Sequence, residues 1–179
     1  MSVATVFNYT YDDYKEWEGE WELIDGYAVA MAPAPVKKHQ RIAGDIFVML
    51  KTSLSDECVE CEVLYEVDWK VSQETVLRPD IVISCYDNKE NYISVAPKLI
   101  VEVLSPSTAK KDETIKFEIY QQEGVEYYIL VYPDELKAKV YTLRDGRYIK
   151  VGDYTKESIS LDDRACFTKI DFSKIFKKI

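Results

Sequence analysis

Residues 99–104 read LIVEVL and are followed by SPST at positions 105–108. Five of the six side chains in LIVEVL are apolar, on both faces of an extended chain, as in a strand that is covered on both sides. Glu102 is the exception. An ionised carboxylate in such a strand costs several kcal/mol unless a cation or hydrogen-bond donors compensate it. The stretch predicts a central strand with a compensated acid.

A second acid occupies a similar position. Asp80 follows Pro79 at the head of IVIS, residues 81–84, twenty-two positions before Glu102. One such acid alone is most simply explained by a buried ion pair or by solvent at a strand end. Two acids on neighbouring core strands favour a shared Mg²⁺, which prefers oxygen ligands and retains waters. An ion held in this way can activate water and stabilise charge on a phosphoryl oxygen.

The surrounding pattern predicts helices and strands in one sheet. Helical spacing or capping indicates helices at 10–18, 37–54 and 111–123, the second with a buried stripe through Ile42, Ile46 and Leu50. Strand patterns cover 60–71, 76–84, 92–95, 99–104 and 127–132. Asp-Gly turns join 21–24 to 27–32 and 137–143 to 147–151 as hairpins. This order predicts an α/β protein with helices packed on a mixed sheet.

The helix at 111–123 carries a candidate lysine. Asp112, Lys116 and Tyr120 are spaced at i, i+4 and i+8, on one helical face. We expect Ile115 and Ile119 to point into the core, which places Lys116 at the margin of the buried stripe. Its long side chain could then reach the strand acids. A solvated lysine paired with Asp112 fits the spacing equally well.

Length, composition and net charge limit the classes of protein to which the chain can belong. A chain of 179 residues, 47% hydrophobic and 31% charged, predicts one globular domain over 1–179. No apolar run approaches the roughly 20 residues of a membrane span, and the N-terminus does not resemble a signal peptide, so we expect a cytoplasmic protein. The net charge of −9 argues against a broad phosphate-binding surface, although bound divalent cations would reverse the local field.

Among the four cysteines, Cys58 and Cys61 form a CxxC, which could be half of a zinc site or a redox pair. A zinc site lacks further ligands, since there is no second CxxC and the only histidine is distant in sequence. We therefore expect reduced, mostly buried thiols at the four positions, Cys58, Cys61, Cys85 and Cys166.

Several segments, in the same order along the chain, resemble the bacterial Uma-type restriction endonuclease family of the PD-(D/E)xK nuclease superfamily. They are WELIDGYAVAMAPAP (21–35), KKHQRIAGDIF (37–47), LRPDIVI (77–83), APKLIVEVLSPSTAKKDETIKFEIYQQEGVEYYILVYPDE (96–135) and KVYTLRDGRY (139–148). The resemblance implies a restriction-endonuclease-like mixed β-sheet core flanked by helices, with an N-terminal and a C-terminal β-hairpin. It also implies hydrolysis of DNA phosphodiester bonds with Mg (or Mn) as cofactor.

The resemblance also assigns site residues. It makes Asp80 and Glu102 catalytic metal ligands. The superfamily lysine two positions after the second acid is replaced here by Leu104, and the family match places the lysine at Lys116 instead. Two family motif positions fall on Glu22, a possible additional acid, and His39, which could hydrogen-bond a water or a phosphate; a solvated carboxylate and a packing histidine are the alternatives.

Partners follow from the same resemblance. Lys110 and Lys111 are candidate substrate phosphate contacts, or an ordinary solvated pair. DNA is the expected substrate, and a homodimer is expected because the superfamily often pairs subunits to cut two strands. The acidic charge, the missing strand lysine and the fourteen tyrosines leave an alternative open. In that alternative the chain is a non-catalytic module that keeps the nuclease fold and binds protein or nucleic acid.

Overall fold

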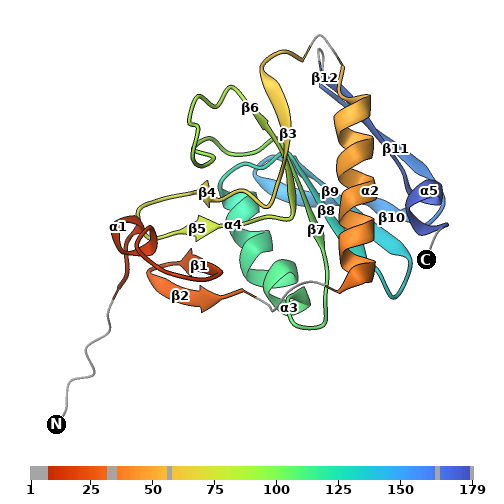
Figure 1. The fold of residues 1–179 in the computed structure, drawn as a ribbon. Coiled ribbons are helices and arrows are strands. Elements are labelled where there is room, and N and C mark those ends of the chain that lie inside the picture. Colours follow the sequence, from red (N-terminus) through yellow and green to blue (C-terminus); the bar gives the residue numbers. More distant parts are fainter. Residues whose placement is uncertain (1–7, 32–35, 56–57, 164–165, 178–179) are drawn as a thin grey trace.

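The computed structural model describes residues 8–31, 36–55, 58–163 and 166–177 (Figure 1). Its main sheet has the strand order β10-β9-β8-β7-β6-β3. β7 and β8 run parallel, and every other neighbouring pair runs antiparallel. The bounds are β3 Cys61–Tyr65, β6 Ile81–Cys85, β7 Leu99–Val103, β8 Tyr127–Tyr132, β9 Lys137–Arg144 and β10 Arg147–Tyr154. The predicted mixed sheet is confirmed.

Helices cover both faces of this sheet (Figure 1). Helix α2, Lys37–Ser53, packs through its buried stripe on one face, together with the short helix α5, Phe172–Phe176. The second face is covered by one helical segment of three consecutive parts: α3 Ala109–Lys111, the π-helical turn η1 Asp112–Lys116, and α4 Phe117–Gln122. Alternate residues of β7 face the two cores, as expected for a strand covered on both sides.

A smaller sheet stands beside the main one. Its strands are β1 Trp21–Ile24, β2 Tyr27–Ala30, β4 Trp69–Lys70 and β5 Val76–Leu77, in the order β2-β1-β5-β4. Helix α1, Tyr11–Tyr14, precedes it and begins at Thr10, whose backbone N–H donates to the Asp13 carboxylate at 2.8 Å. A separate hairpin, β11 Ser158–Asp163 with β12 Cys166–Asp171, and helix α5 were not predicted from the sequence.

Both predicted Asp-Gly hairpins are confirmed. The turn residues have positive φ at Asp25 (49°) and Gly26 (79°), and at Asp145 (49°) and Gly146 (74°). Two successive residues with positive φ make a type I′ turn, which matches the twist of the flanking strands. The described residues contain no helix long and apolar enough to cross a membrane.

Three predicted strands differ from the structure. The stretch 76–84 divides into β5 and β6, which belong to different sheets, and residues 78–80 connect them. The stretch 60–71 divides into β3 and β4 at Glu66, where a φ of 50° interrupts the extended chain. The strand predicted at 92–95 is wrong, since only a single bridge joins Ile93 to Trp69. The first division turns the chain at Asp80.

The expectation that Ile115 points into the core is wrong, whereas Lys116, expected at the margin of the buried stripe, does reach the strand acid Glu102. The side chain of Ile115 is 47% exposed, whereas that of Lys116 is buried. The cause is the π-helical turn Asp112–Lys116, because i→i+5 bonding places one additional residue in the turn and shifts the residues that face the core. Such turns are frequent at functional sites.

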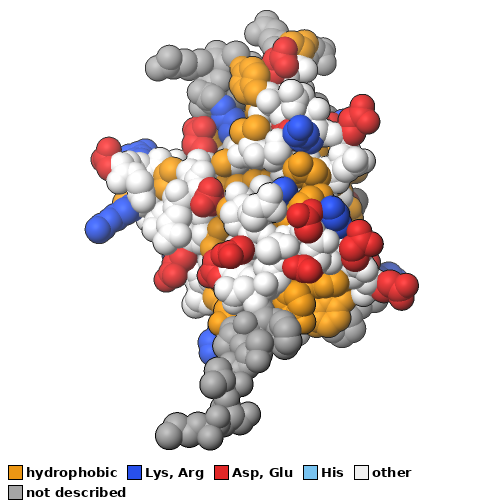
Figure 2. Space-filling model, turned by 90° about the vertical axis from the view of Figure 1, so that its left-hand side faces the viewer, with side chains coloured by type: hydrophobic (Ala, Val, Ile, Leu, Met, Phe, Trp, Pro, Cys, Tyr) orange, Lys and Arg blue, Asp and Glu red, His pale blue; other side chains and the backbone are white. Residues whose placement is uncertain are grey.

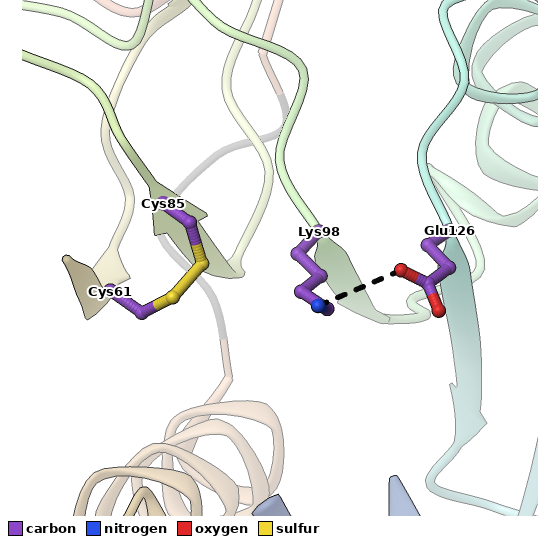
Figure 3. The surroundings of a disulfide bond; sticks show 4 residues. All are labelled: Cys61, Cys85, Lys98 and Glu126. Carbon is purple, nitrogen blue, oxygen red and sulfur yellow. Dashed lines mark ion pairs between the residues drawn. A yellow bond between two sulfur atoms is a disulfide. The ribbon is translucent and has the colours of Figure 1, made fainter. Parts of the chain in front are cut away.

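The expectation of reduced cysteines is wrong for Cys58, which is disulfide-bonded, and for Cys61 and Cys85, which form a disulfide with each other (Figure 3). The two residues face each other across the antiparallel pair β3–β6, with a Cα–Cα distance of 4.0 Å. The same view shows an ion pair between Lys98, which precedes β7, and Glu126, which precedes β8. The Lys98 Nζ and Glu126 Oε2 atoms are 3.8 Å apart. The side chain of Cys166 lies outside the described residues.

Candidate active site

The structure brings Asp80 and Glu102 together. The register of β6 and β7 opposes Ile81 to Val101, so Asp80 lies level with Glu102 on the neighbouring strand. The Asp80 backbone N–H lies 3.4 Å from Glu102 Oε2, and Asp80 Oδ2 accepts a hydrogen bond from the Val103 N–H at 2.7 Å. Backbone hydrogen bonding between adjacent strands therefore fixes the two carboxylates relative to each other.

Lys116 lies at the centre of a buried group of acids. Its Nζ is 2.9 Å from Glu22 Oε1, 2.9 Å from Glu102 Oε1 and 3.7 Å from Asp112 Oδ1. All four side chains are at most 4% exposed. The Tyr120 hydroxyl, also buried, donates to Glu102 Oε1 at 2.8 Å. One oxygen of Glu102 is thus held by two donors, which leaves Oε2 on the side of Asp80.

The electrostatics follow from this crowding. Burial raises the pKa of Glu102 to about 8, and the charges of Asp112 and Asp80 add to this effect, whereas Lys116 opposes it. Burial would lower the pKa of Lys116, but Glu102, Glu22 and Asp112 outweigh it and hold that pKa well above its usual value. Burial, together with the Glu102 charge, raises the pKa of Tyr120, so its hydroxyl remains a donor.

Glu22, from β1, joins the same network. Burial opposes its ionisation, but Lys116 and Lys111 outweigh that effect and lower the Glu22 pKa to about 2. Lys111 forms an ion pair with Glu22 Oε2, and the Arg78 N–H donates to Glu22 Oε1 at 3.0 Å. Lys111 also lines the pocket at the site, whereas Lys110 is exposed and does not. Glu22 is therefore an ionised carboxylate rather than a solvated hairpin residue.

His39, from the first turn of α2, contacts Asp80. Its Nε2 lies 3.2 Å from Asp80 Oδ2, and its buried Nδ1 has no hydrogen-bond partner among the described residues. Burial would lower the pKa of His39, but the hydrogen bond to Asp80 and the charges of Asp80 and Glu66 raise it overall. The histidine consequently favours the charged form that pairs with Asp80.

These residues open onto a pocket of about 320 Å³. Its walls include Asp80, Glu102, Lys116, Lys111 and His39. Two oxygens remain for a ligand, since no described residue donates a hydrogen bond to Asp80 Oδ1 and only the long 3.4 Å contact reaches Glu102 Oε2. Within the part of the chain that the structure describes, no three His, Cys, Asp or Glu side chains are grouped to hold a metal ion. Mg²⁺ bound by one or two carboxylates plus waters fits such a donor set.

Two members of the network had no assigned role in the sequence reasoning. Tyr120 and Asp112 share a helical face with Lys116, and that i, i+4, i+8 spacing was visible in the sequence. The burial of Asp112 and the bond from Tyr120 to Glu102 were not visible, because both depend on how the π-helical turn packs on β7.

Comparisons with known proteins identify the family and the fold of the chain. Residues 11–165 match the family described as "Uma2: Putative restriction endonuclease", which confirms the resemblance inferred from the sequence motifs. An uncharacterized protein of Synechocystis sp. is 27% identical over 172 residues, covering 90% of this chain and 86% of that protein. A crystal structure from Anabaena variabilis, described as a "putative nuclease belonging to DUF820", aligns with a TM-score of 0.73 at 17% identity. The alignment covers 94% of this chain and 97% of that one, so the two proteins share a fold.

Proposed function

Because this chain belongs to the Uma2 putative restriction endonuclease family, we propose that it is a divalent-metal-dependent endonuclease that hydrolyses phosphodiester bonds in DNA. The observation that carries the proposal is the convergence of Asp80 and Glu102, from adjacent strands, on one pocket beside the buried Lys116. Mg²⁺ or Mn²⁺ held by the two acids would stabilise the charge that develops on a phosphoryl oxygen.

Charge balance supports a cation at this place. Four carboxylates lie together, on Asp80, Glu102, Glu22 and Asp112. The ammonium groups of Lys116 and Lys111, with His39 beside Asp80, offset only part of their charge. Burial is the main cause of the raised pKa of Glu102, and the charges of Asp112 and Asp80 raise that pKa further. An added cation would relieve the repulsion and favour the ionised form of Glu102. The negative net charge of the whole chain is therefore compatible with an anionic substrate at this pocket.

The residues of the chain have separate tasks in this proposal. Lys116 and Tyr120 hold Glu102 Oε1, so that Oε2 keeps one orientation. The Val103 N–H and His39 hold Asp80 Oδ2, which leaves Oδ1 for the ligand. Lys116 also lines the pocket, where its ammonium group can orient the attacking water, the task that a strand lysine would have at Leu104. Preorganised groups of this kind lower the barrier because they need no rearrangement during the reaction.

A plasmid cleavage assay tests the proposal. Wild-type protein is incubated with supercoiled plasmid and Mg²⁺ or Mn²⁺, beside Asp80→Asn, Glu102→Gln and the control Glu118→Gln, an exposed acid on α4. We expect wild type and Glu118→Gln to nick the plasmid, and the two site variants to lose about 100-fold or more in rate. Equal activity in all four proteins, or none in any, would contradict the catalytic assignment.

Calorimetry separates catalysis from the alternative of a non-catalytic binding module. Saturable Mn²⁺ binding that Asp80→Asn abolishes supports a metal-dependent enzyme. Tight DNA binding that needs neither the ion nor Asp80 favours the non-catalytic module. We further propose a homodimer, since two paired sites can cut the two strands of a duplex together. A monomer throughout the micromolar range in analytical ultracentrifugation contradicts it.

A further inference from the structure

A second pocket, of about 210 Å³, lies across Arg78 from the candidate active site. Arg78 lines both pockets. The neighbouring residues Trp21 and Glu22 of β1 also separate them, because successive side chains of a strand point to opposite sides. Trp21 faces the second pocket, and Glu22 faces the carboxylate network. The two pockets are therefore next to each other, with a single strand and one connecting residue between them.

Aromatic side chains form the walls of this second pocket, which we call the aromatic pocket. They come from three separate segments: Tyr11, Tyr14 and Trp17 in and after α1, Trp21 in β1, and Tyr92 in the connection before β7. Their ring centroids are 5.1–6.4 Å from at least one neighbouring ring. All except Tyr14 are partly exposed, so ring surface remains open to a ligand. Figure 2 faces the side that carries α1 and shows hydrophobic side chains at the surface among charged ones.

Polar groups in the aromatic pocket have fixed positions. Asp68 accepts hydrogen bonds from the Tyr14 hydroxyl at 2.9 Å and from Arg78 Nε at 2.6 Å. Trp21 Nε1 donates to the Glu18 carbonyl at 2.8 Å, which fixes the plane of the indole. The chain passes close to that ring at Gly19, where φ is +91° and a Cβ would lie 3.3 Å from Trp21 Nε1. The pocket thus offers rigid ring surfaces beside an oriented donor and acceptor pair.

A cation is also near. Lys70 Nζ lies 4.0 Å from the centroid of the Tyr11 ring and 5.7 Å from that of Tyr92. Lys15 lines the pocket as well. These positive charges, with Arg78 already paired to Asp68, make the pocket unsuitable as a cage for a cationic ligand. Its volume is also below the roughly 300–1,000 Å³ of pockets that take drug-sized molecules. A small, planar, neutral ring next to an anionic group fits better.

We propose that the aromatic pocket binds a nucleobase of the nucleic acid strand on which the active site acts, at a nucleotide flanking the scissile phosphate. Aromatic side chains accept any base by stacking, and the Asp68–Arg78 pair offers both an acceptor and donors to the edge of the base. The identity of the polymer rests on the proposed nuclease function, whereas recognition of the base rests on the pocket itself.

Intrinsic fluorescence tests this assignment. The pocket contains Trp17 and Trp21, whereas the third tryptophan, Trp69, is 1% exposed in the core, so a bound base quenches mainly the two pocket residues. Asp80→Asn protein in EDTA is titrated with dTMP, dAMP and short oligothymidylate, so that cleavage does not contribute. We expect saturable quenching, with a Kd that Tyr92→Ala weakens by about 5- to 100-fold.

Two control variants keep the test specific. Tyr86→Ala removes a tyrosine that is 77% exposed outside the pocket, and it should bind as wild type. Tyr92→Phe keeps the ring and should also bind as wild type. Equal affinity of Tyr92→Ala and Tyr86→Ala would overturn the proposal, as would a loss of binding in Tyr92→Phe equal to that in Tyr92→Ala. Circular dichroism confirms that each variant is folded before titration.

Comparing the titrations with mononucleotides and with oligothymidylate identifies the source of the base. If oligothymidylate quenches the fluorescence, whether or not mononucleotides also do, the pocket binds a base within a strand. If only mononucleotides quench it, the pocket binds a free nucleotide, and the strand proposal is overturned. No saturable quenching by any ligand overturns the pocket assignment, even if plasmid cleavage succeeds. Conversely, quenching in a protein that never cleaves plasmid keeps the base site and refutes only the nuclease function.

Discussion

Replacing Lys116 by methionine should destabilise the protein severely. The ammonium group of Lys116 is within 4 Å of three buried carboxylates, on Glu22, Glu102 and Asp112. Methionine keeps much of the side-chain volume but leaves those acids without their shared cation. Removing one partner of a buried ion pair costs about 3–5 kcal/mol, because the remaining charge stays uncompensated. That loss is a large fraction of the 5–15 kcal/mol by which a domain is typically stable.

The expected loss depends on pH in a defined direction. Without Lys116, the pKa of Glu22 in the folded protein is no longer held low by that ammonium group, and the pKa of Glu102, which is already raised to about 8, rises further. An acid with a raised pKa folds most favourably while it is protonated, and its contribution is lost as the pH rises through its folded-state pKa. The destabilisation by Lys116→Met should therefore be larger at pH 8 than at pH 5.

Guanidinium unfolding followed by tryptophan fluorescence measures this effect, with free energies extrapolated at both pH values. The control is Lys110→Met, which removes an exposed lysine from the same helical segment and should change stability by no more than about 0.5 kcal/mol. Two outcomes would refute the claim that Lys116 compensates the buried carboxylates: unfolding of both variants at the same denaturant concentration, or a larger loss of stability in Lys116→Met at pH 5 than at pH 8.

Three further predictions concern separate features. The lowered pKa of Glu22, about 2 against 4.5, contributes about 3 kcal/mol above pH 4.5 that is lost as the pH falls towards 2, so Glu22→Gln should flatten the acid limb of the stability curve. Gly146→Ala should lower stability by about 1 kcal/mol, because φ is 74° at this position. Gly44→Ala should raise stability, because Gly44 lies within α2 with open space around it. Thermal unfolding compares the two variants, and equal shifts in melting temperature would refute the turn argument. Replacing both Cys61 and Cys85 by alanine should cost about 3 kcal/mol in urea unfolding, because the disulfide closes a loop with a sequence separation of 24; an unchanged midpoint would contradict this.

Local patterns in the sequence predicted much of the fold. The apolar run that forms β7 indicated a strand covered on both faces, and the structure places helices on both sides of it. The two Asp-Gly pairs predicted two-residue turns, because only a few residue types adopt positive φ readily. The capping of α1 and the buried stripe of α2 follow in the same way from short spacings.

The site was predictable in part. The sequence marked Glu102 and Asp80 because a carboxylate in an apolar strand is expensive, and the register of β6 and β7 brings the two acids together. It left open whether Lys116 is solvated. The answer depends on a π-helical turn, whose single additional residue turns Lys116 inwards and Ile115 outwards, and helical spacing alone gives no sign of it.

By itself, the sequence determined the features that arise within a few neighbouring residues: the buried strands, the hairpin turns, the helix faces and the two acids that burial makes costly. Only the tertiary structure decided which distant groups share one environment. It set Lys116 among Glu22, Glu102 and Asp112, paired Cys61 with Cys85, and gathered the aromatic pocket from three segments. The physical reason is that propensity and turn chemistry act locally, whereas charge compensation and ring packing depend on distances through space, which packing of the two sheets fixes.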